Sequence, residues 1–174
     1  MKFYLLGTDA VYSNYPKMKN WSGKMDSRNL NIHDAYKIPS RQLFMIQESE
    51  NTVFTSIIDN PFPMISAEVR EVFDLYEPHI IYKEVILLDS KYEKAGIYYL
   101  PILEEIDCLS EASEYNLNRS IIRKGIIDYE RTEGKAIFRL AGVRHYYMAA
   151  RLDLVESILK RNVKGIGLTE LEVC

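Results

Sequence analysis

The spacing of apolar residues along the chain predicts a series of short strands interrupted by two helices. Runs of apolar, aromatic and β-branched residues bounded by turn residues are typical of strands. Such runs occur at residues 3–6, 42–47, 52–58, 80–88, 96–103, 126–130, 135–140, 145–149 and 165–173. In two other segments the apolar residues recur three or four positions apart, which places them on one face of a helix.

Both predicted helices carry signals for their ends. The first is expected to begin at Ser66, whose side-chain oxygen can accept from the free amides of a first turn, and to end near Glu77, just before a proline. The second is expected over Leu152 to Arg161, with Asn162 or Gly165 as its exit. The basic residues at the end of the second helix complement its negative C-terminal end.

Two pairs of neighbouring strands are predicted to form antiparallel hairpins. The first pairs residues 80–88 with 96–103, across a polar connection. The second pairs residues 126–130 with 135–140, across a turn in which Gly134 is free to adopt a positive φ angle.

The order of strand, helix and strand occurs twice, at residues 54–88 and 145–173. We therefore predict a single α+β domain over residues 1–174, with a largely antiparallel sheet, two principal helices and two faint strand–helix–strand halves.

Residues 7–41 form a long segment without apolar periodicity, rich in Asn, Ser, Gly, Pro and Lys. Loops of more than about 15 residues inside a compact domain are uncommon, and they tend to be functional or mobile. The segment also contains three tyrosines and the single tryptophan, which can hold a loop against the fold. We expect a long irregular segment that is partly ordered.

Composition places the chain among ordinary globular proteins, with 47% hydrophobic and 27% charged residues in 174. Cys108 and Cys174 do not have the dense spacing of a disulfide framework, so both are expected to be reduced. The N-terminal residues lack the apolar core of a signal peptide, and no apolar run approaches the roughly 20 residues of a membrane span. These features predict a soluble, cytoplasmic protein without a membrane partner.

The charges are unevenly distributed along the chain. The net charge is −3, which gives no general attraction to nucleic acid. One acidic stretch, residues 104–114, contains no Lys or Arg, and a basic stretch follows it. The acidic residues and the tyrosine beside them form a candidate partner-binding site, although solvated surface explains the same residues. The candidate site consists of Glu104, Glu105, Asp107, Glu111, Glu114 and Tyr115.

Tyrosine supports a binding role because it combines a large rigid contact area with a hydrogen-bonding group. The chain has 13 tyrosines, including the pairs Tyr98–Tyr99 and Tyr146–Tyr147. Neighbouring residues of a strand point to opposite faces, so one member of each pair can face away from the core.

No motif for catalysis or for a cofactor is present. The three histidines do not occur at metal-ligand spacing, and the sequence lacks the glycine-rich phosphate and dinucleotide motifs, the GxSxG motif and the HExxH motif. Asp107 and Cys108 are adjacent and would point to opposite faces of a strand, so Cys108 is expected to be a small buried hydrophobe. We expect no metal, no cofactor and no enzymatic reaction.

Three segments together resemble a known family. They are Pro63 to Phe73, Tyr98 to Leu109, and Ala136 to Leu140 followed by a helix and Gly165 to Leu171. In this order they are similar to bacterial polymorphic-toxin immunity proteins of the eleventh immunity family, formerly a domain of unknown function. The resemblance covers residues 43–173. It implies a cytoplasmic protein that neutralises a cognate toxin protein, commonly encoded beside it, by stoichiometric binding.

Two other interpretations remain open. The chain could be a small carboxylate-dependent hydrolase that uses Glu104 with Glu105, or Glu111 with Glu114, with residues 7–41 as a lid. It could also be a structural subunit that associates with itself, for example as a homodimer.

Overall fold

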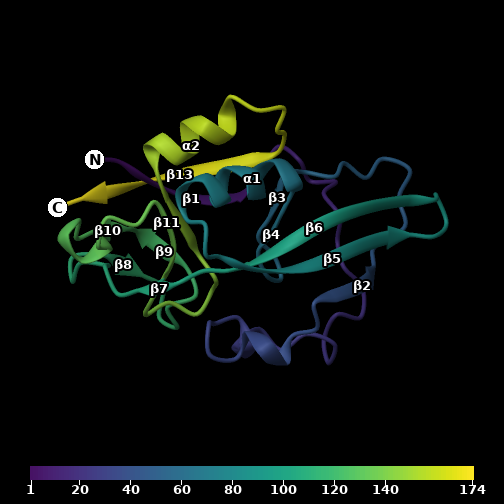
Figure 1. The fold of residues 1–174 in the computed structure, drawn as a ribbon, viewed down its shortest axis with the longest axis horizontal. Helices are drawn as coiled ribbons and strands as arrows, with labels where there is room; N and C mark the ends of the chain where they lie inside the picture. Colours follow the sequence, from purple (N-terminus) through teal and green to yellow (C-terminus); the bar gives the residue numbers. More distant parts are fainter.

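Two helices lie side by side against two sheets, and most of the remaining chain connects these elements (Figure 1). The computed structural model describes all residues from 1 to 174. The helices are α1 (Ala67–Tyr76) and α2 (Leu152–Leu159), and three short 3₁₀ helices occur in loops: η1 (Ser27–Asn29), η2 (Ala35–Lys37) and η3 (Glu130–Thr132). Neither α-helix has the length and apolar character that a membrane crossing requires.

The larger sheet has six strands and the smaller sheet has five. The order in the larger sheet is β10 (Ile126–Ile127), β13 (Ile166–Val173), β1 (Phe3–Thr8), β12 (Met148–Arg151), β11 (Ile137–Leu140) and β7 (Glu105–Ile106). The order in the smaller sheet is β2 (Arg41–Met45), β5 (Ile81–Asp89), β6 (Lys94–Ile102), β4 (Met64–Ile65) and β3 (Ile57–Ile58). A separate two-stranded ribbon joins β8 (Glu114–Tyr115) to β9 (Ile122–Lys124). Most pairings are antiparallel, which confirms the predicted α+β class.

The two halves of the molecule share one topology. In the first half, β4 and β5 are joined through α1, and β6 lies between them, antiparallel to both. In the second half, β12 and β13 are joined through α2, and β1 lies between them, antiparallel to both. The outer strands correspond as well: β3 pairs with β4 as β11 pairs with β12, and β2 runs parallel to β5 as β10 runs parallel to β13.

This correspondence confirms and extends the two predicted strand–helix–strand halves. The middle strand of the second half is formed by the N-terminal residues, so the repeat is not apparent from the order of elements in the sequence. Within the two larger sheets only β7 has no counterpart: it extends the six-stranded sheet beyond β11, in parallel.

The helices contact each other, and the buried residues of both belong to the main core. The Tyr76 hydroxyl at the end of α1 donates to the Asp153 carbonyl at the start of α2, at 2.9 Å. Val72 and Phe73 of α1 are fully buried, as is Leu154 of α2. The buried faces repeat at helical spacing, as the apolar stripes predicted.

The predicted ends of the first helix are confirmed. The Ser66 hydroxyl accepts from the Val69 amide at 3.4 Å, and the Glu77 amide closes the last turn on the Phe73 carbonyl at 2.8 Å. The hairpin predicted over residues 80–103 is also present, as β5 and β6.

The second predicted hairpin is wrong. Gly134 has the expected positive φ of 75°, but η3 precedes it, and β10 and β11 do not pair with each other. The buried Thr132 hydroxyl donates to the Tyr129 carbonyl at 2.7 Å and stabilises η3, which spans the end of the first predicted strand and the start of the predicted turn. Each strand instead pairs with a distant partner, β10 with β13 and β11 with β12.

The strand predicted at residues 52–58 is reduced to β3, and the strand predicted at 145–149 begins only at Met148. In the first case the backbone of residues 53–56 bonds to loops, since the Val53 amide donates to Asn14 and the Ser56 amide donates to Lys164. These bonds replace those of a longer strand.

Residues 9–40 connect β1 to β2 and contain only η1, η2 and isolated bridges. Four side chains of this segment are buried in the main core: Met25, Leu30, Ala35 and Ile38. The segment is therefore held by its apolar side chains as well as by backbone hydrogen bonds.

The shared topology predicts that a circular permutant will fold. Phe3 of β1 lies opposite Leu171 of β13, so the chain ends are neighbours (Figure 1). In the permutant, a short Gly/Ser linker joins the present chain ends, and the new ends lie between the exposed residues Glu111 and Ala112. In this order β1 directly follows β13, just as β6 directly follows β5 in the first half. We expect native circular dichroism and dispersed NMR signals. A permutant opened between Tyr98 and Tyr99, inside β6, is the control that should not fold; an unfolded Glu111–Ala112 permutant would contradict the topology.

Asp89 at the end of β5 predicts a specific pH dependence of stability. The side chain is buried, and its carboxylate accepts from the amides of Ser49, Lys91 and Tyr92 at 2.9 to 3.2 Å. Burial alone would raise its pKa, but the three donors together hold the pKa below the ordinary value of 3.8. A lowered folded-state pKa stabilises the fold above 3.8, and this contribution is lost as pH falls through the folded-state pKa.

We therefore expect Asp89→Asn to unfold more easily than the wild type in denaturant at pH 7. The difference should shrink as the pH is lowered beneath 3.8, where the wild-type carboxylate becomes protonated. If the difference in unfolding free energy between the two proteins stays constant across that pH range, the charge of Asp89 does not contribute to stability.

Candidate functional site

Three adjoining hollows surround β7 at the edge of the larger sheet. An apolar hollow of about 180 Å³ shares Glu104 with an acidic hollow of about 310 Å³, and the acidic hollow shares Glu105 with an arginine-lined hollow of about 480 Å³. We call these three hollows together the β7 surface. The acidic hollow adjoins both of the others, because it shares one lining residue with each.

Tyr146 fixes the position of this surface. The residue is buried, its hydroxyl accepts from the Leu103 amide at 2.9 Å, and the same hydroxyl donates to the Pro101 carbonyl at 3.1 Å. Burial raises the pKa of Tyr146 to about 12, so the hydroxyl remains protonated and able to donate. It therefore holds the chain where it leaves β6 for β7.

Backbone hydrogen bonds then attach β7 to β11. The Arg139 amide donates to the Glu104 carbonyl at 2.9 Å, and the Ala141 amide donates to the Ile106 carbonyl at 3.0 Å. This pairing places the side chains of residues 104–107 at the rim of the larger sheet. The other side of β7 is a free edge of the sheet.

The acidic hollow combines residues that are distant in the sequence. Glu104, Glu105 and Asp107 line it from the β7 segment, and Glu130 and Glu133 line it from η3 and the turn after it. Arg131 is the one cation in the lining, and it pairs with Asp128 at 3.1 Å.

The carboxylates of this hollow differ in their partners. Glu104 pairs with Lys135 at 2.9 Å, and this hydrogen bond raises the pKa of the lysine; Glu105 pairs with Arg139 at 3.2 Å. Asp107, Glu130 and Glu133 are exposed and make no ion pair. Their charges face solvent and are available to a positively charged partner. No group of three or more His, Cys, Asp or Glu residues is arranged to hold a metal ion.

The other two hollows add different chemistry to the β7 surface. The apolar hollow lies between the start of β5 and the end of β6, and it includes Ile32, with 54% of its surface exposed, and the partly exposed Ile81. The arginine-lined hollow includes Arg119, Arg139, Arg144 and the fully exposed Leu117. Apolar, negative and positive regions therefore follow one another around β7.

The structure brings together half of the predicted acidic site. Glu104, Glu105 and Asp107 line one hollow, whereas Glu111 lies in an exposed turn outside it. Glu114 lies in β8, opposite Lys124 of β9 in the strand register, and also outside the hollow.

Tyr115 also lies outside the acidic hollow, but it reaches the β7 surface indirectly. Its ring packs under the guanidinium of Arg119, whose Cζ atom is 4.8 Å from the ring centroid. Arg119 in turn lines the arginine hollow.

Sequence reasoning missed Glu130, Glu133 and the three arginines. The two glutamates fell inside the incorrectly predicted hairpin, where nothing indicated contact with residues 104–107. Their proximity depends on the parallel pairing of β7 with β11, which has no local sequence signal.

Each of the two tyrosine pairs has one buried member and one half-buried member, as predicted. Tyr98 is buried and donates to the Thr55 carbonyl at 2.7 Å, whereas Tyr99 lies half-buried on the other face of β6. The Arg70 guanidinium lies 4.5 Å from the rings of both Tyr99 and Tyr82. In the second pair, Tyr146 is buried and Tyr147 is half-buried.

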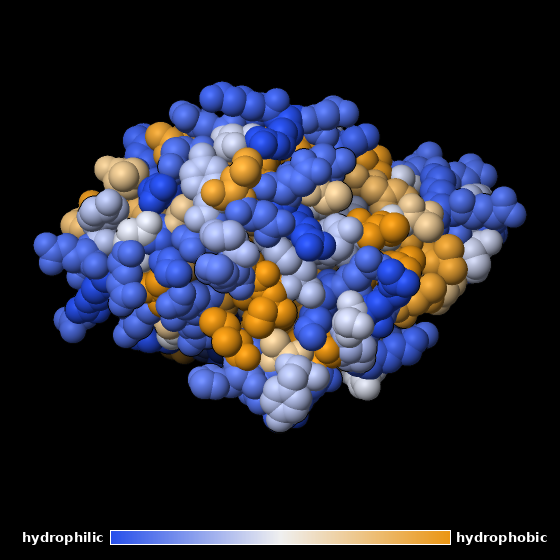
Figure 2. Space-filling model, viewed as in Figure 1, coloured by the Kyte–Doolittle hydropathy of each residue, from blue (hydrophilic) through white to orange (hydrophobic).

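A row of apolar side chains crosses the smaller sheet. Leu43 of β2 lies opposite Ile86 of β5, which lies opposite Ile97 of β6. Leu43 is 48% exposed and Ile97 is 58% exposed. Figure 2 shows apolar surface gathered at the end of the molecule where Figure 1 draws β5 and β6. We call this row the β2–β5–β6 face.

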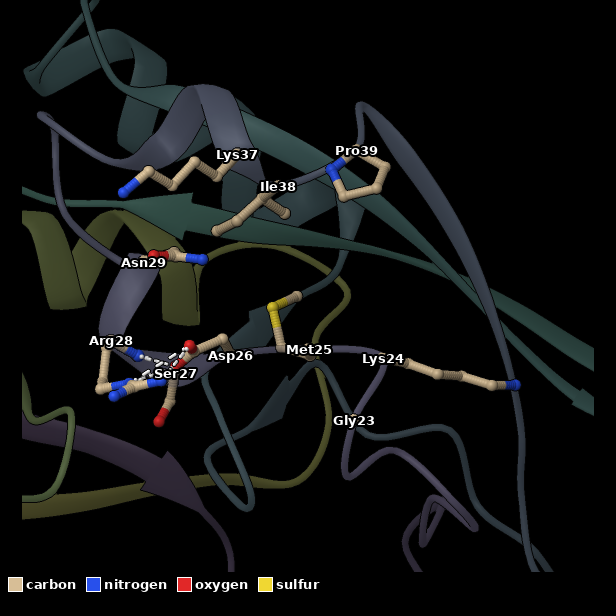
Figure 3. Close-up of a pocket in the computed structure, with 10 residues that line it drawn as sticks. All are labelled: Gly23, Lys24, Met25, Asp26, Ser27, Arg28, Asn29, Lys37, Ile38 and Pro39. Atoms are coloured by element: carbon tan, nitrogen blue, oxygen red, sulfur yellow. Dashed lines mark hydrogen bonds and ion pairs between the residues drawn. The ribbon is translucent and has the colours of Figure 1, made fainter.

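Another hollow, of about 460 Å³, lies within residues 23–39 (Figure 3). Its charges are mostly neutralised, because Arg28 pairs with Asp26 at 2.8 Å and Lys37 pairs with Asp34 at 2.8 Å. Arg28 lowers the pKa of Asp26 to about 2. Figure 3 shows Lys24 and Lys37 extending in opposite directions, so their charges do not converge on one ligand position.

No protein-family model matches the chain, and no curated protein matches it. The resemblance to immunity proteins therefore remains a prediction from the sequence.

Cys108 is fully buried, as predicted, and Cys174 is exposed. Burial, with a further contribution from the neighbouring Asp107, raises the pKa of the Cys108 thiol to about 12. Because the thiolate is the reactive form, we expect iodoacetamide at mildly alkaline pH to modify only Cys174 in the folded protein and both residues after unfolding. Peptide mass spectrometry measures this. Rapid modification of Cys108 in the folded protein would contradict its burial.

Proposed function

We propose that this protein is an immunity protein that neutralises a cognate bacterial toxin domain by stoichiometric binding through the β7 surface. The observation that carries the proposal is the acidic hollow, where three unpaired carboxylates lie beside exposed apolar residues. The resemblance of residues 43–173 to immunity proteins supports the same conclusion.

The charge around the acidic hollow, as distinct from the arginine-lined hollow beside it, suits a basic partner. Around the acidic hollow, six carboxylates accompany three cations. They are Glu104, Glu105, Asp107, Asp128, Glu130 and Glu133, with Arg131, Lys135 and Arg139. A toxin that acts on nucleic acid needs a basic groove for the phosphate backbone. An acidic surface would accelerate the encounter with such a groove and occupy it.

The apolar residues beside the acidic hollow would supply contact area. Ile32 and Ile81 of the apolar hollow, and Leu117 at the opposite end of the β7 surface, expose apolar area that a partner would remove from water. Protein interfaces commonly combine an apolar region with a polar rim. The β7 surface therefore offers both contact area and charge complementarity.

The hydrolase alternative is less well supported. It needs residues 7–41 to open as a lid, but Met25, Leu30 and Ile38 of this segment lie in the main core. Exposing a fully buried side chain of this size costs about 1.5–3 kcal/mol. Three such residues make opening unfavourable.

The proposal predicts the effect of reversing the three unpaired charges. Replacing Asp107, Glu130 and Glu133 with Lys should slow association with the toxin encoded beside the gene by about tenfold or more at low salt. The difference in association rate between the variant and the wild type should decrease as added salt screens the charges. Stopped-flow or biosensor kinetics measure the rate, and survival of cells that express both proteins measures protection.

The matched control replaces Glu50, Glu71 and Glu156 with Lys. These residues are exposed and make no ion pair, so the net charge changes equally without altering the acidic hollow. A second variant, Glu111→Lys with Glu114→Lys, tests the part of the predicted segment outside the hollow and should have a smaller effect. Equal slowing by the control would remove the acidic hollow from consideration. Survival without complex formation would instead indicate enzymatic detoxification.

A further inference from the structure

The arginine hollow contains an unusual local excess of positive charge. Three arginines from separate segments line it: Arg119 after β8, Arg139 in β11 and Arg144 after β11. Glu105 is the only carboxylate in the lining. A concentration of cations is notable here because the whole chain carries a net charge of −3.

Arg139 is held in place by the fold. Its side chain is only 18% exposed, and its guanidinium lies 4.6 Å from the centre of the Tyr146 ring. One terminal nitrogen donates to the Leu30 carbonyl at 3.1 Å and pairs with Glu105 at 3.2 Å. Its Nε atom is buried and has no hydrogen-bond partner in the chain. Arg139 is therefore a fixed guanidinium in the lining, and Glu105 partly balances its charge.

Arg119 and Arg144 carry the charges that are not neutralised. Neither makes an ion pair with a carboxylate, and both are exposed. The Arg144 amide donates to the Arg119 carbonyl at 2.9 Å, so their backbones are fixed beside each other. Stacking on Tyr115 orients the Arg119 guanidinium, which also lies next to Gly142 in the lining.

We propose that the arginine hollow is a binding site for the phosphate group of a small molecule. Two unpaired guanidiniums match the charge of a phosphate at neutral pH, and their planar donors match the geometry of its oxygens. The hollow is shallow and open, with a volume of about 480 Å³, so a phosphate group can enter it from solvent. Leu117 and Val143 in the lining supply an apolar wall for the remainder of a phosphorylated compound. This site goes beyond toxin neutralisation and does not require a toxin to be present.

Binding can be measured by NMR on the isolated full chain. The probes are inorganic phosphate and adenosine monophosphate, each titrated at constant ionic strength against sodium chloride. We expect saturable shifts of the Arg119, Gly142 and Arg144 amides with phosphate and none with chloride. Tighter binding of the nucleotide identifies a phosphorylated organic ligand, whereas equal binding identifies phosphate itself; both results support the site.

Substitutions test whether Arg119 and Arg144 are responsible for phosphate binding. Arg119→Gln with Arg144→Gln should weaken phosphate binding by about tenfold or more, because two charge-assisted contacts are removed. Arg123→Gln removes one exposed, unpaired arginine outside the hollow and should leave binding unchanged. Thermal unfolding in chloride confirms that each variant is folded. Absence of saturable shifts with both probes, or equal weakening by Arg123→Gln, would overturn the proposal.

Discussion

The buried hydroxyl of Tyr146 is the contact on which the candidate surface depends. It accepts from Leu103 and donates to Pro101, so it holds the chain at the point where β6 ends and β7 begins. The ring of the same residue lies under Arg139, which pairs with Glu105 of β7. One buried side chain therefore positions both an acidic and a basic region of the β7 surface.

The fold explains why such a surface occurs at this place. The two halves repeat one arrangement of strands around two contacting helices. In each half, the segment before one strand bonds to the residues that follow the helix of the other half. The segment before β11 bonds to Glu77 after α1, and the segment before β3 bonds to Lys164 after α2. The residues outside this repeat follow the two middle strands: residues 9–40 follow β1, and β7 with the β8–β9 ribbon follows β6. The hollows lie where the second of these connections leaves the repeated core.

Local sequence signals predicted the elements of the fold better than their pairing. Ser66 marked the start of α1, and the polar connection between two apolar runs marked the β5–β6 hairpin, because both features act over a few residues. The incorrect hairpin at residues 126–140 had the same local signals, including Gly134. It failed because β10 and β11 gain burial and hydrogen bonds from β13 and β12, which are distant in the sequence. The candidate site was half predicted for the same reason: Glu104, Glu105 and Asp107 are near in sequence, whereas Glu130 and Glu133 reach them only through tertiary structure.

We propose above that a toxin binds at the β7 surface. Hydrogen–deuterium exchange of the protein, alone and in complex with the proposed cognate toxin, tests this assignment. We expect slower exchange in the complex at residues 104–107 and 130–133, with little change in β2 and the outer part of β6. Protection confined to the β2–β5–β6 face, with unchanged exchange around β7, would contradict it.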